Sequence, residues 1–415
     1  MLATAASLMV EKEAEARKAT SVWLQVASHL DPRFGGLSTA VPALAASAES
    51  AGPHLAPLAV FCGPTEDISH IAARQLHAFR FPHGRGRWMR EKALQDQLRD
   101  LVESADGVHI HGVWAEYCSI AAHLSRAAGK PYLVAAHGML ESWALQQKRL
   151  RKTLYSALIE RPNLREASCL QALTAAEIDD YRRYGLTNPV AVIPNGVDVP
   201  DAVTPDIFLE AFPQLRGRKL ALFLGRLSRK KGLDILCRAW ARIHCDFPEA
   251  RLVIAGPDSD GTGPAAEALV GRLNLRESIV FTGMLAHGMK WSALAAAHLF
   301  VLPSYSEGFS AAVLEALGMG LPVAVSRQCN FPEVSSRRCG LVIEPEARQV
   351  EEALGVLLAA DASEMESLRT NARALVASRY TWSAVGRMLS EVYEWILGGR
   401  LPANVELSRC AGGAR

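Results

Sequence analysis

Short apolar runs alternate along the chain with longer segments of helical periodicity, and this alternation is the main structural signal. A helix-like segment from Ser38 to Ala51 follows the first run, and helical segments separate most of the others. Strands that alternate with helices predict a parallel sheet with helices on both faces. The first set of predicted strands is Ser21 to Ala27, Leu55 to Cys62, Leu76 to Phe81, Val108 to His111, Tyr132 to Ala136, Leu170 to Leu173 and Val190 to Ile193.

The same alternation starts again after a linker-like segment at Asn195-Gly196-Val197-Asp198, which is followed by polar, proline-bearing sequence as far as Pro213. Helices are expected to begin at Leu233, Ala265, Lys290, Ser310 and Val350. The second set of predicted strands is Leu220 to Leu224, Arg251 to Ala255, Ile279 to Phe281, Leu299 to Leu302, Val323 to Val325 and Leu341 to Ile343. The chain is therefore predicted to be α/β, with two Rossmann-like, doubly wound parallel-sheet domains in tandem.

The predicted organisation has five parts. An N-terminal extension (1–20) precedes the first domain (21–198), and the second domain (199–380) follows the linker. A terminal helix (381–398), with apolar residues at helical spacing, is expected to cross the domain junction, and the tail (399–415) is expected to be loose.

One strand, loop and helix in the second domain carries two carboxylates. Glu307 lies in the loop after the predicted strand, and Glu315 lies one to two turns inside a helix for which Ser310 is the expected N-cap. Gly308 allows a ligand to approach the backbone. The free N–H groups of a helix start bind phosphate, and carboxylates accept hydrogen bonds from sugar hydroxyls. Two solvated surface charges are the alternative.

A basic loop follows the first strand of the second domain, at Gly225-Arg226-Leu227-Ser228-Arg229-Lys230-Lys231-Gly232. Arg226 can hold two phosphate oxygens in a fork, and Lys231 supplies a compact charge. Together they can neutralise a diphosphate without a metal ion. A solvated basic loop is the alternative.

Two features of the first domain lie at predicted strand ends. His109 and His111 are two residues apart, so both imidazoles point to one face of a strand, and His137 ends the next strand. An H-x-H metal pair with His137 as a third ligand is a possible site, but the expected carboxylates are missing at recognisable spacing. The glycine pair Gly35-Gly36 suits either a ligand loop or a plain tight turn.

Composition excludes several classes of protein. The chain has 415 residues, a net charge of +2 and 8 cysteines scattered singly. This charge argues against a nucleic-acid partner, and the cysteines suggest neither a zinc framework nor disulfides. With no convincing secretion signal or membrane span, a cytoplasmic location is expected.

Three of these motifs resemble those of the retaining glycosyltransferases of family 4. The segment from Glu307 to Glu315, with E-G-F-S and a glycine-proline exit at Gly320-Leu321-Pro322, resembles the E-x7-E segment of that family. The loop that carries Arg226 and Lys231 resembles the G-R-x-x-x-x-K-G motif, and Asn195 to Asp198 resembles an N-G-V-D linker.

The resemblance implies a glycosyltransferase B fold, with the two domains facing across a cleft, and transfer of a sugar from a nucleoside-diphosphate sugar with retention of configuration. It implies catalytic contacts of His111 and Glu307 with the transferred sugar, contact of Glu315 with the ribose, and an acceptor-side role for His137. No metal and no other cofactor is expected. The implied donor-binding residues are Gly36, Arg226, Lys231, Gly308, Phe309, Ser310 and Glu315.

The acceptor is expected to be a sugar, an oligosaccharide or a lipid-linked sugar. A basic amphipathic segment from Gln146 to Arg165 and a cluster of Arg80, Arg85, Arg87 and Arg90 allow peripheral contact with the inner face of a membrane, although a solvated helix face is the commoner explanation of such a segment.

Three other functions stay open. A nucleotide-sugar 2-epimerase would share the donor half. A hydrolase could be metal-dependent through His109, His111 and His137, or a glycosidase that uses Glu307 and Glu315. The glycosidase is disfavoured because both carboxylates lie at the start of one helix, whereas they would have to flank a bond across a cleft. A non-catalytic sugar-binding protein would not need so complete a donor site.

Overall fold

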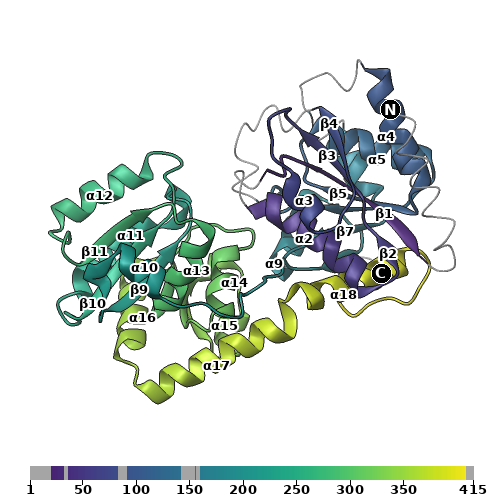
Figure 1. Cartoon of the computed structure of the whole chain (residues 1–415). Coiled ribbons are helices and arrows are strands. Elements are labelled where there is room, and N and C mark those ends of the chain that lie inside the picture. Colours follow the sequence, from purple (N-terminus) through teal and green to yellow (C-terminus); the bar gives the residue numbers. More distant parts are fainter. Residues whose placement is uncertain (1–19, 32–35, 83–90, 142–154, 156–158, 408–415) are drawn as a thin grey trace. The chain divides into compact units, whose positions relative to one another are not determined.

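The computed structural model describes residues 20–31, 36–82, 91–141, 155 and 159–407. The chain forms two compact units (Figure 1). Unit 1 contains the residues up to Gly196 and those from Trp382 onward, and unit 2 runs from Val197 to Thr381. Most of the predicted N-terminal extension, residues 146–154 and 156–158 of the helix candidate from Gln146 to Arg165, and the arginines at 85, 87 and 90 lie outside the described residues.

Unit 1 is built on a sheet with the strand order β15-β8-β7-β6-β5-β1-β3-β4, in which every pair except that of β15 and β8 is parallel, and β2 pairs separately with β1. The strand order reverses between the neighbours β1 and β5: strands β3 and β4 lie on one side of β1, and β5 to β8 lie on the other. The strands are β1 (Ser21–Ser28), β2 (His54–Leu55), β3 (Leu58–Cys62), β4 (Ala78–Pro82), β5 (Gly107–His111), β6 (Tyr132–Ala135), β7 (Cys169–Ala172), β8 (Val190–Val192) and β15 (Val405–Glu406).

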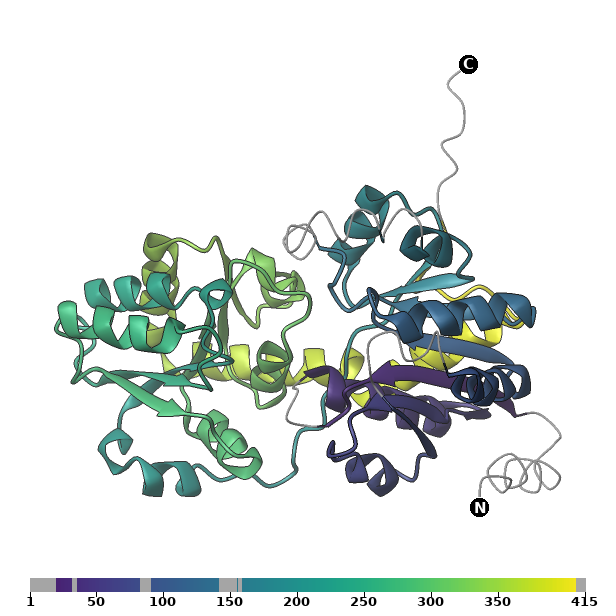
Figure 2. The ribbon, with the colours of Figure 1, turned by 90° about the horizontal axis from the view of Figure 1, so that it is seen from above.

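Helices cover both faces of this sheet (Figure 2). Leu24 and Val26 of β1 pack in the apolar cluster that contains residues of α4 and α5, whereas Trp23 packs with residues of α2 and α18. This division follows from the alternation of side chains along a strand. The helices are α2 (Gly36–Ala51), α3 (Ser69–Ala73), α4 (Lys92–Ser104), α5 (Glu116–Ala127), α8 (Arg161–Arg165), α9 (Ala175–Tyr184) and α18 (Trp382–Ile396).

Unit 2 has a six-stranded sheet with the order β11-β10-β9-β12-β13-β14, all of whose pairs are parallel. The strand order of this sheet reverses between β9 and β12. The strands are β9 (Lys219–Leu224), β10 (Ala250–Ala255), β11 (Ile279–Gly283), β12 (Leu299–Leu302), β13 (Val323–Ser326) and β14 (Gly340–Ile343).

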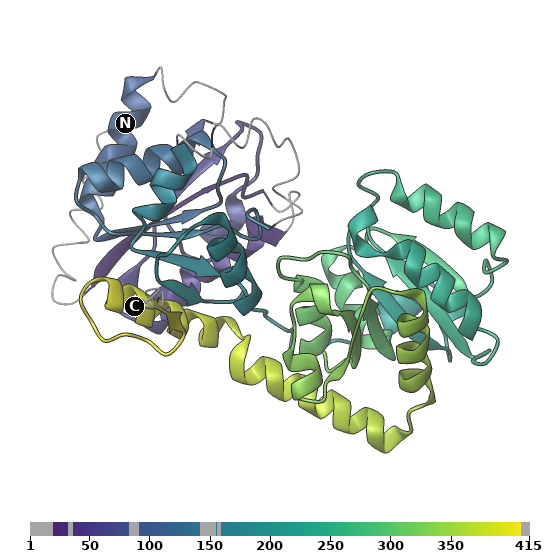
Figure 3. The same ribbon diagram turned by 180° about the vertical axis from the view of Figure 1, so that it is seen from behind.

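Two helical layers enclose this sheet (Figure 3). α11 packs against α12 and α16, while α10 packs against α13 and α14 against α17. The helices are α10 (Asp206–Ala211), α11 (Leu233–Ile243), α12 (Thr262–Arg272), α13 (His287–Ala296), α14 (Ala311–Gly318), α15 (Glu333–Ser336), α16 (Ala347–Ala359) and α17 (Ala362–Arg379), and the 3₁₀ turns are η3 (Pro213–Leu215), η4 (Arg229–Lys231) and η5 (Arg327–Cys329).

The division between the units falls two residues before the predicted end of the first domain. Val197 donates its N–H to the carbonyl oxygen of Tyr380 at 2.8 Å and forms a parallel bridge with Thr381. These backbone contacts tie Val197 to unit 2. The terminal helix α18 belongs to unit 1, where it packs along α2 and stacks Tyr393 on Trp23 with ring centroids 3.9 Å apart; its crossing of the domain junction stays a prediction.

Two further predictions need correction. The predicted loose tail contains a strand, because Val405 and Glu406 form β15, which pairs antiparallel with β8. Residues 408–415 lie outside the described chain. The predicted strand from Leu55 to Cys62 is two strands, because Pro57 between them has no N–H for a sheet hydrogen bond. Among the described helices, none combines the length and the apolar character that a bilayer crossing needs.

We expect Gly232→Ala to destabilise unit 2 more than Gly217→Ala does. Both glycines have positive φ, 71° and 69° respectively, so both substitutions carry the strain of the left-handed region. A β-carbon at Gly232 would also overlap the carbonyl oxygen of Pro303, whereas open space surrounds Gly217. Urea unfolding should give a loss of about 1 kcal/mol for Gly217→Ala and roughly 3 kcal/mol for Gly232→Ala. Equal losses would contradict the close approach.

Candidate active site

The two loops predicted to bind a donor follow neighbouring strands of unit 2. The loop from Gly225 to Gly232 follows β9, the loop from Pro303 to Ser310 follows β12, and β9 pairs with β12. In open α/β sheets, ligands bind at the carboxyl ends of the strands where the strand order reverses. The fold therefore brings the loop of Arg226 and Lys231 to Glu307, although Lys231 and Glu307 are 76 residues apart in the sequence.

Lys231 and Glu307 form a buried ion pair. The ammonium Nζ of Lys231 lies 2.5 Å from Oε1 of Glu307, and the side chains are only 12% and 6% exposed. The hydroxyl of Ser304 donates to the same carboxylate oxygen at 2.7 Å. The carboxylate charge is thus balanced, and Lys231 is held in place before any ligand arrives. Arg226, at the other end of the same loop, is exposed.

Backbone contacts hold the two loops together. The N–H of Tyr305 donates to the carbonyl oxygen of Lys230 at 2.7 Å, so the loops are joined directly beside the ion pair. Asn330, which has a positive φ of 60°, donates from its side-chain amide to the carbonyl oxygen of Glu307 at 2.7 Å. Sequence reasoning missed Asn330, because only the pairing of β12 with β13 brings its turn to this loop.

Glu315 also has a cationic partner that the sequence did not reveal. The Nζ of Lys290, from α13, lies 2.7 Å from Oε1 of Glu315, and both side chains are about one-fifth exposed, at 22% and 19%. The same ammonium lies 4.8 Å from the ring centroid of Trp291. Lys290 is therefore a further candidate for the donor site, placed there by the packing of α13 rather than by any local motif.

The residues between the two carboxylates have unequal roles in the structure. Ser310 occupies the N-cap position of α14, as predicted, but its side chain makes no capping hydrogen bond. The ring of Phe309 packs on the rings of Phe331 and Tyr380, at centroid distances of 4.9 and 6.2 Å, so it supports the loop from the core side. Gly308 is partly exposed, and its role in donor binding stays a prediction.

The corresponding switch point in unit 1 lies between β1 and β5. Gly36 is the first residue of α2, and it is exposed with open space around the position of its absent side chain. Gly35 lies outside the described residues, so the turn and the ligand interpretations of this pair both stay open. His111 is the last residue of β5 and His137 follows β6, which pairs with β5.

His111 is completely buried. Its Nε2 lies 3.0 Å from Oε1 of Gln25, and its Nδ1 lies 3.2 Å from Nε2 of His137. His137 has a positive φ of 51° and remains partly exposed. A ligand at this edge would therefore meet His137 first, and the catalytic contact of His111 stays a prediction.

Burial keeps these imidazoles neutral at pH 7. Desolvation lowers the pKa of His109 to about 3 and that of His137 to about 4, although His137 as a residue is partly exposed. It also holds the pKa of His111 well below its usual value, and the nearby His109 and His137 lower it further. Within the described ranges, no three His, Cys, Asp or Glu side chains form a group that could hold a metal ion.

Two buried glutamates support the loops at this edge, and sequence reasoning missed both. Glu160 accepts a hydrogen bond from the backbone N–H of Trp114 at 3.0 Å, and Trp114 itself has a positive φ of 69°. Glu177 accepts from the N–H of Gly138 at 2.8 Å, next to His137. Desolvation raises the pKa of each carboxyl to about 7. Neither residue stands in a recognisable motif, since each acts on a loop far away in the sequence.

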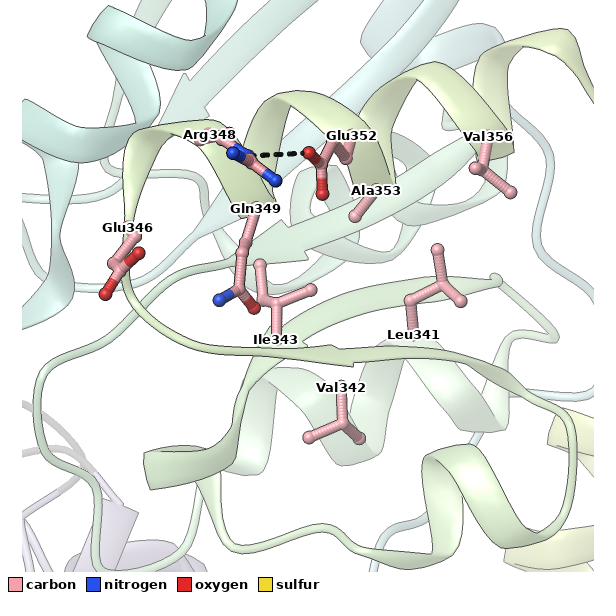
Figure 4. A pocket seen from close by; sticks show the side chains of 9 residues that line it. All are labelled: Leu341, Val342, Ile343, Glu346, Arg348, Gln349, Glu352, Ala353 and Val356. Atoms are coloured by element: carbon pink, nitrogen blue, oxygen red, sulfur yellow. Dashed lines mark hydrogen bonds and ion pairs between the residues drawn. The ribbon is translucent and has the colours of Figure 1, made fainter.

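A pocket of about 460 Å³ lies elsewhere on unit 2, between β14 and α16 (Figure 4). Leu341 and Ile343 of β14 face the helix, and Arg348 and Glu352 form an ion pair at 2.9 Å along it. None of the predicted site residues lines this pocket.

Comparison with known proteins finds matches in both units. Residues 218–360 match the family model described as "Glycosyl transferases group 1", and residues 35–196 match the one described as "Glycosyl transferase 4-like domain". The two matches together take in most of both units.

Curated relatives and a solved structure agree with these matches. The chain is 28% identical over 326 residues to the GDP-mannose:cellobiosyl-diphosphopolyprenol alpha-mannosyltransferase of Xanthomonas oryzae pv. oryzae, covering 72% of this chain and 77% of that protein. It is 29% identical over 225 residues to the phosphatidyl-myo-inositol mannosyltransferase of Mycobacterium tuberculosis, covering 52% of this chain but only 57% of that protein. HepE from Anabaena, solved with UDP and glucose, superposes with a TM-score of 0.71 at 18% identity, covering 90% of this chain and 100% of that one.

We expect the stability of the wild type to fall, relative to Glu160→Gln, as the pH rises from 5 to 8. A raised pKa means that the folded protein keeps a proton that the unfolded chain releases near pH 4.5. The stabilisation is therefore complete below about pH 4.5 and is lost as the pH rises through about 7. Glutamine keeps the oxygen that accepts from Trp114 and does not titrate.

Urea unfolding of both proteins at pH 5 and pH 8 measures this difference, which should be roughly 2 kcal/mol. A difference that is constant over this range would show that the carboxyl of Glu160 titrates normally.

Proposed function

The chain belongs to glycosyltransferase family 4 and has the glycosyltransferase B fold, and from this premise we propose that it transfers a sugar from a nucleoside-diphosphate sugar to a sugar or lipid-linked acceptor. We further propose that transfer retains the anomeric configuration and needs no metal ion. Glycan, polysaccharide or glycolipid synthesis is the process that such a reaction serves.

The observation that carries this proposal is the ion pair of Lys231 and Glu307 at the switch point of unit 2. It fixes a cation beside the start of α14, with Arg226 on the same loop. A departing nucleoside diphosphate gains negative charge in the transition state, and pre-positioned cations and helix N–H groups stabilise that charge without reorganisation. This donor set offers charge compensation from protein groups alone.

The names of the relatives support a lipid-linked acceptor. The Xanthomonas relative is named for GDP-mannose and a cellobiosyl-diphosphopolyprenol, and the mycobacterial relative for phosphatidyl-myo-inositol. HepE was solved with UDP and glucose. These names include different bases and sugars, so our proposal names a nucleoside-diphosphate sugar as the donor class and assigns the acceptor to unit 1, on the side of His137.

A transfer assay with a panel of UDP-, GDP- and ADP-sugars and polyprenyl-diphosphate or glycolipid acceptors tests the function. Each donor is also incubated alone, because an epimerase would alter it without an acceptor. Transfer that continues in EDTA would support metal independence, and transfer lost in EDTA and restored by manganese or magnesium would contradict it. NMR of the product anomeric centre would decide between retention and inversion.

We expect Arg226→Ala and Lys231→Met each to weaken binding of the nucleoside diphosphate by about 10- to 100-fold, the range of one charge-assisted contact. Arg216→Ala removes an exposed cation of the same unit that lies outside both donor loops, and it should bind like the wild type. Calorimetric titration gives the three affinities, and thermal unfolding checks Lys231→Met, because this variant leaves Glu307 buried without its cation. Unchanged affinity in both loop variants would place the phosphate site elsewhere.

Glu307→Gln and Glu315→Gln should fail in different ways. Glu307 is assigned to the sugar, whose charge changes in the transition state, so its amide variant should lower turnover by roughly 100-fold. Glu315 is assigned to the ribose, which does not react, so its variant should weaken diphosphate binding by about tenfold. Turnover, the donor KM and the Kd of free diphosphate distinguish the two. Normal turnover with weakened binding in Glu307→Gln would reverse this assignment.

A further inference from the structure

A chain of hydrogen bonds runs through the buried face of unit 1, and its direction can be read from one backbone carbonyl. The side-chain Nε2 of Gln25 lies 2.9 Å from the carbonyl oxygen of Trp23 and 3.0 Å from the hydroxyl of Tyr393. A carbonyl oxygen can only accept, so the NH₂ group of Gln25 must face it. The opposite orientation would place two oxygens against each other. The amide orientation is thus fixed by chemistry.

The orientation of Gln25 determines where the protons of two histidines lie. Oε1 of Gln25 is an acceptor, so His111 must carry its proton on Nε2, 3.0 Å away. A neutral His111 then has a lone pair on Nδ1, which faces Nε2 of His137 at 3.2 Å. His137 must therefore donate from Nε2, and its own lone pair is on Nδ1. Each step follows from the donor and acceptor capacity of one group.

At the other end of this hydrogen-bond chain, the direction of donation follows from the same amide. The hydroxyl of Tyr393 accepts from Gln25, and Nδ1 of His109, 2.9 Å away, is the remaining partner for its own proton. This leaves the proton of His109 on Nε2, which has no hydrogen-bond partner among the described residues. Gln171, whose Nε2 donates to the carbonyl oxygen of Ile193, has an equally unpartnered Oε1 within the same described ranges. Its side chain raises the pKa of His109, as an acceptor for that proton would.

We propose that Gln25 is a positioning residue that fixes the neutral tautomers of His111 and His137, so that His137 offers an unprotonated Nδ1 as a hydrogen-bond acceptor to a substrate hydroxyl. His111 transmits this orientation and is not itself the group in contact with the ligand. The tautomers follow from the geometry alone, whereas the role toward a hydroxyl rests on the proposed function.

The residues around this chain of hydrogen bonds preserve the direction in which each bond is donated. Gln25, His109 and His111 are all fully buried, so water does not compete for their hydrogen bonds. The ring of Tyr393 stacks on that of Trp23 at an interplanar angle of 7°, and this contact holds the hydroxyl at the amide. The low pKa values of the three histidines keep each ring neutral, as a definite tautomer requires. Helix α18, the last helix of the described chain, thus helps to hold the amide of a residue on the first strand.

The full-length protein, labelled with ¹⁵N at histidine, tests the tautomers by long-range ¹H–¹⁵N correlation at pH 7. Protonated and unprotonated ring nitrogens have well separated ¹⁵N shifts, and His111→Gln and His137→Gln identify the signals of these residues. We expect Nε2 to be protonated and Nδ1 unprotonated in both His111 and His137. The reverse tautomer in either ring, or a doubly protonated ring, would overturn the proposal.

Two variants test the role of Gln25. Gln25→Met keeps the volume of the side chain and removes the amide, so His111 and His137 should populate both tautomers, and turnover should fall roughly tenfold with a smaller change in the donor KM. Tyr393→Phe keeps the ring that stacks on Trp23 and removes only the hydroxyl. It should change the signals of His109 and leave those of His111 and His137 as in the wild type.

The outcomes separate this proposal from the proposed function. If Gln25→Met does not fold, the wild-type spectrum and that of Tyr393→Phe still decide the tautomers. A Tyr393→Phe spectrum in which His111 changes its tautomer would show that the Trp23 carbonyl does not fix the amide. Failure to detect any sugar transfer, with the expected tautomers present, would refute the proposed function and leave the hydrogen-bond chain standing. Predicted tautomers with full turnover in Gln25→Met would refute the positioning role.

Discussion

The burial of both faces of a parallel sheet is the constraint on which the rest of this structure depends. Strands such as β3 and β12 are buried throughout, and apolar side chains fill them. Polar side chains then occur in two kinds of position near such a sheet. They can follow the strand, as Glu307 does in the loop after β12, or they can form a closed hydrogen-bonded set, as Gln25 and His111 do inside unit 1. The first way gives loops that can meet a ligand, and the second gives rigid support behind them.

The fold could be predicted from the sequence because each buried strand forms a short apolar run that a local pattern reveals. The bounds of β12 and the start of α11 were predicted as the structure has them. The 18-residue α17 was missed, although Asp361 and Glu364 form a capping box at its start, because its apolar positions do not form one continuous stripe. β15 was missed for another reason: two residues carry no periodicity, and only pairing with β8 defines the strand.

For the candidate site, the sequence predicted the motif residues but not the residues that contact them. Local motifs identified Arg226, Lys231, Glu307 and Glu315, because glycines and charges at fixed spacing mark loops at strand ends. The partners of these residues were not predictable, since Lys290 and Gln25 reach Glu315 and His111 only through the order of the strands and the packing of the helices. Nothing in the sequence pattern indicated a fully buried His111, because the depth of a strand-end side chain depends on the loop that covers it.

The ion pair of Lys231 and Glu307 limits how the donor loops can act. Breaking a buried pair costs more than such a pair contributes, because the remaining charge loses both water and partner. Moving Lys231 away from Glu307 would therefore cost free energy, so on the proposed function a phosphate would share the ammonium with Glu307 rather than replace the carboxylate. Three N–H donors on an ammonium allow this sharing, and Ser304 already provides the carboxylate with a second donor. Arg226 is exposed and stands outside this buried pair, so on the proposed function its guanidinium would be the cation free to follow the charge of a departing diphosphate.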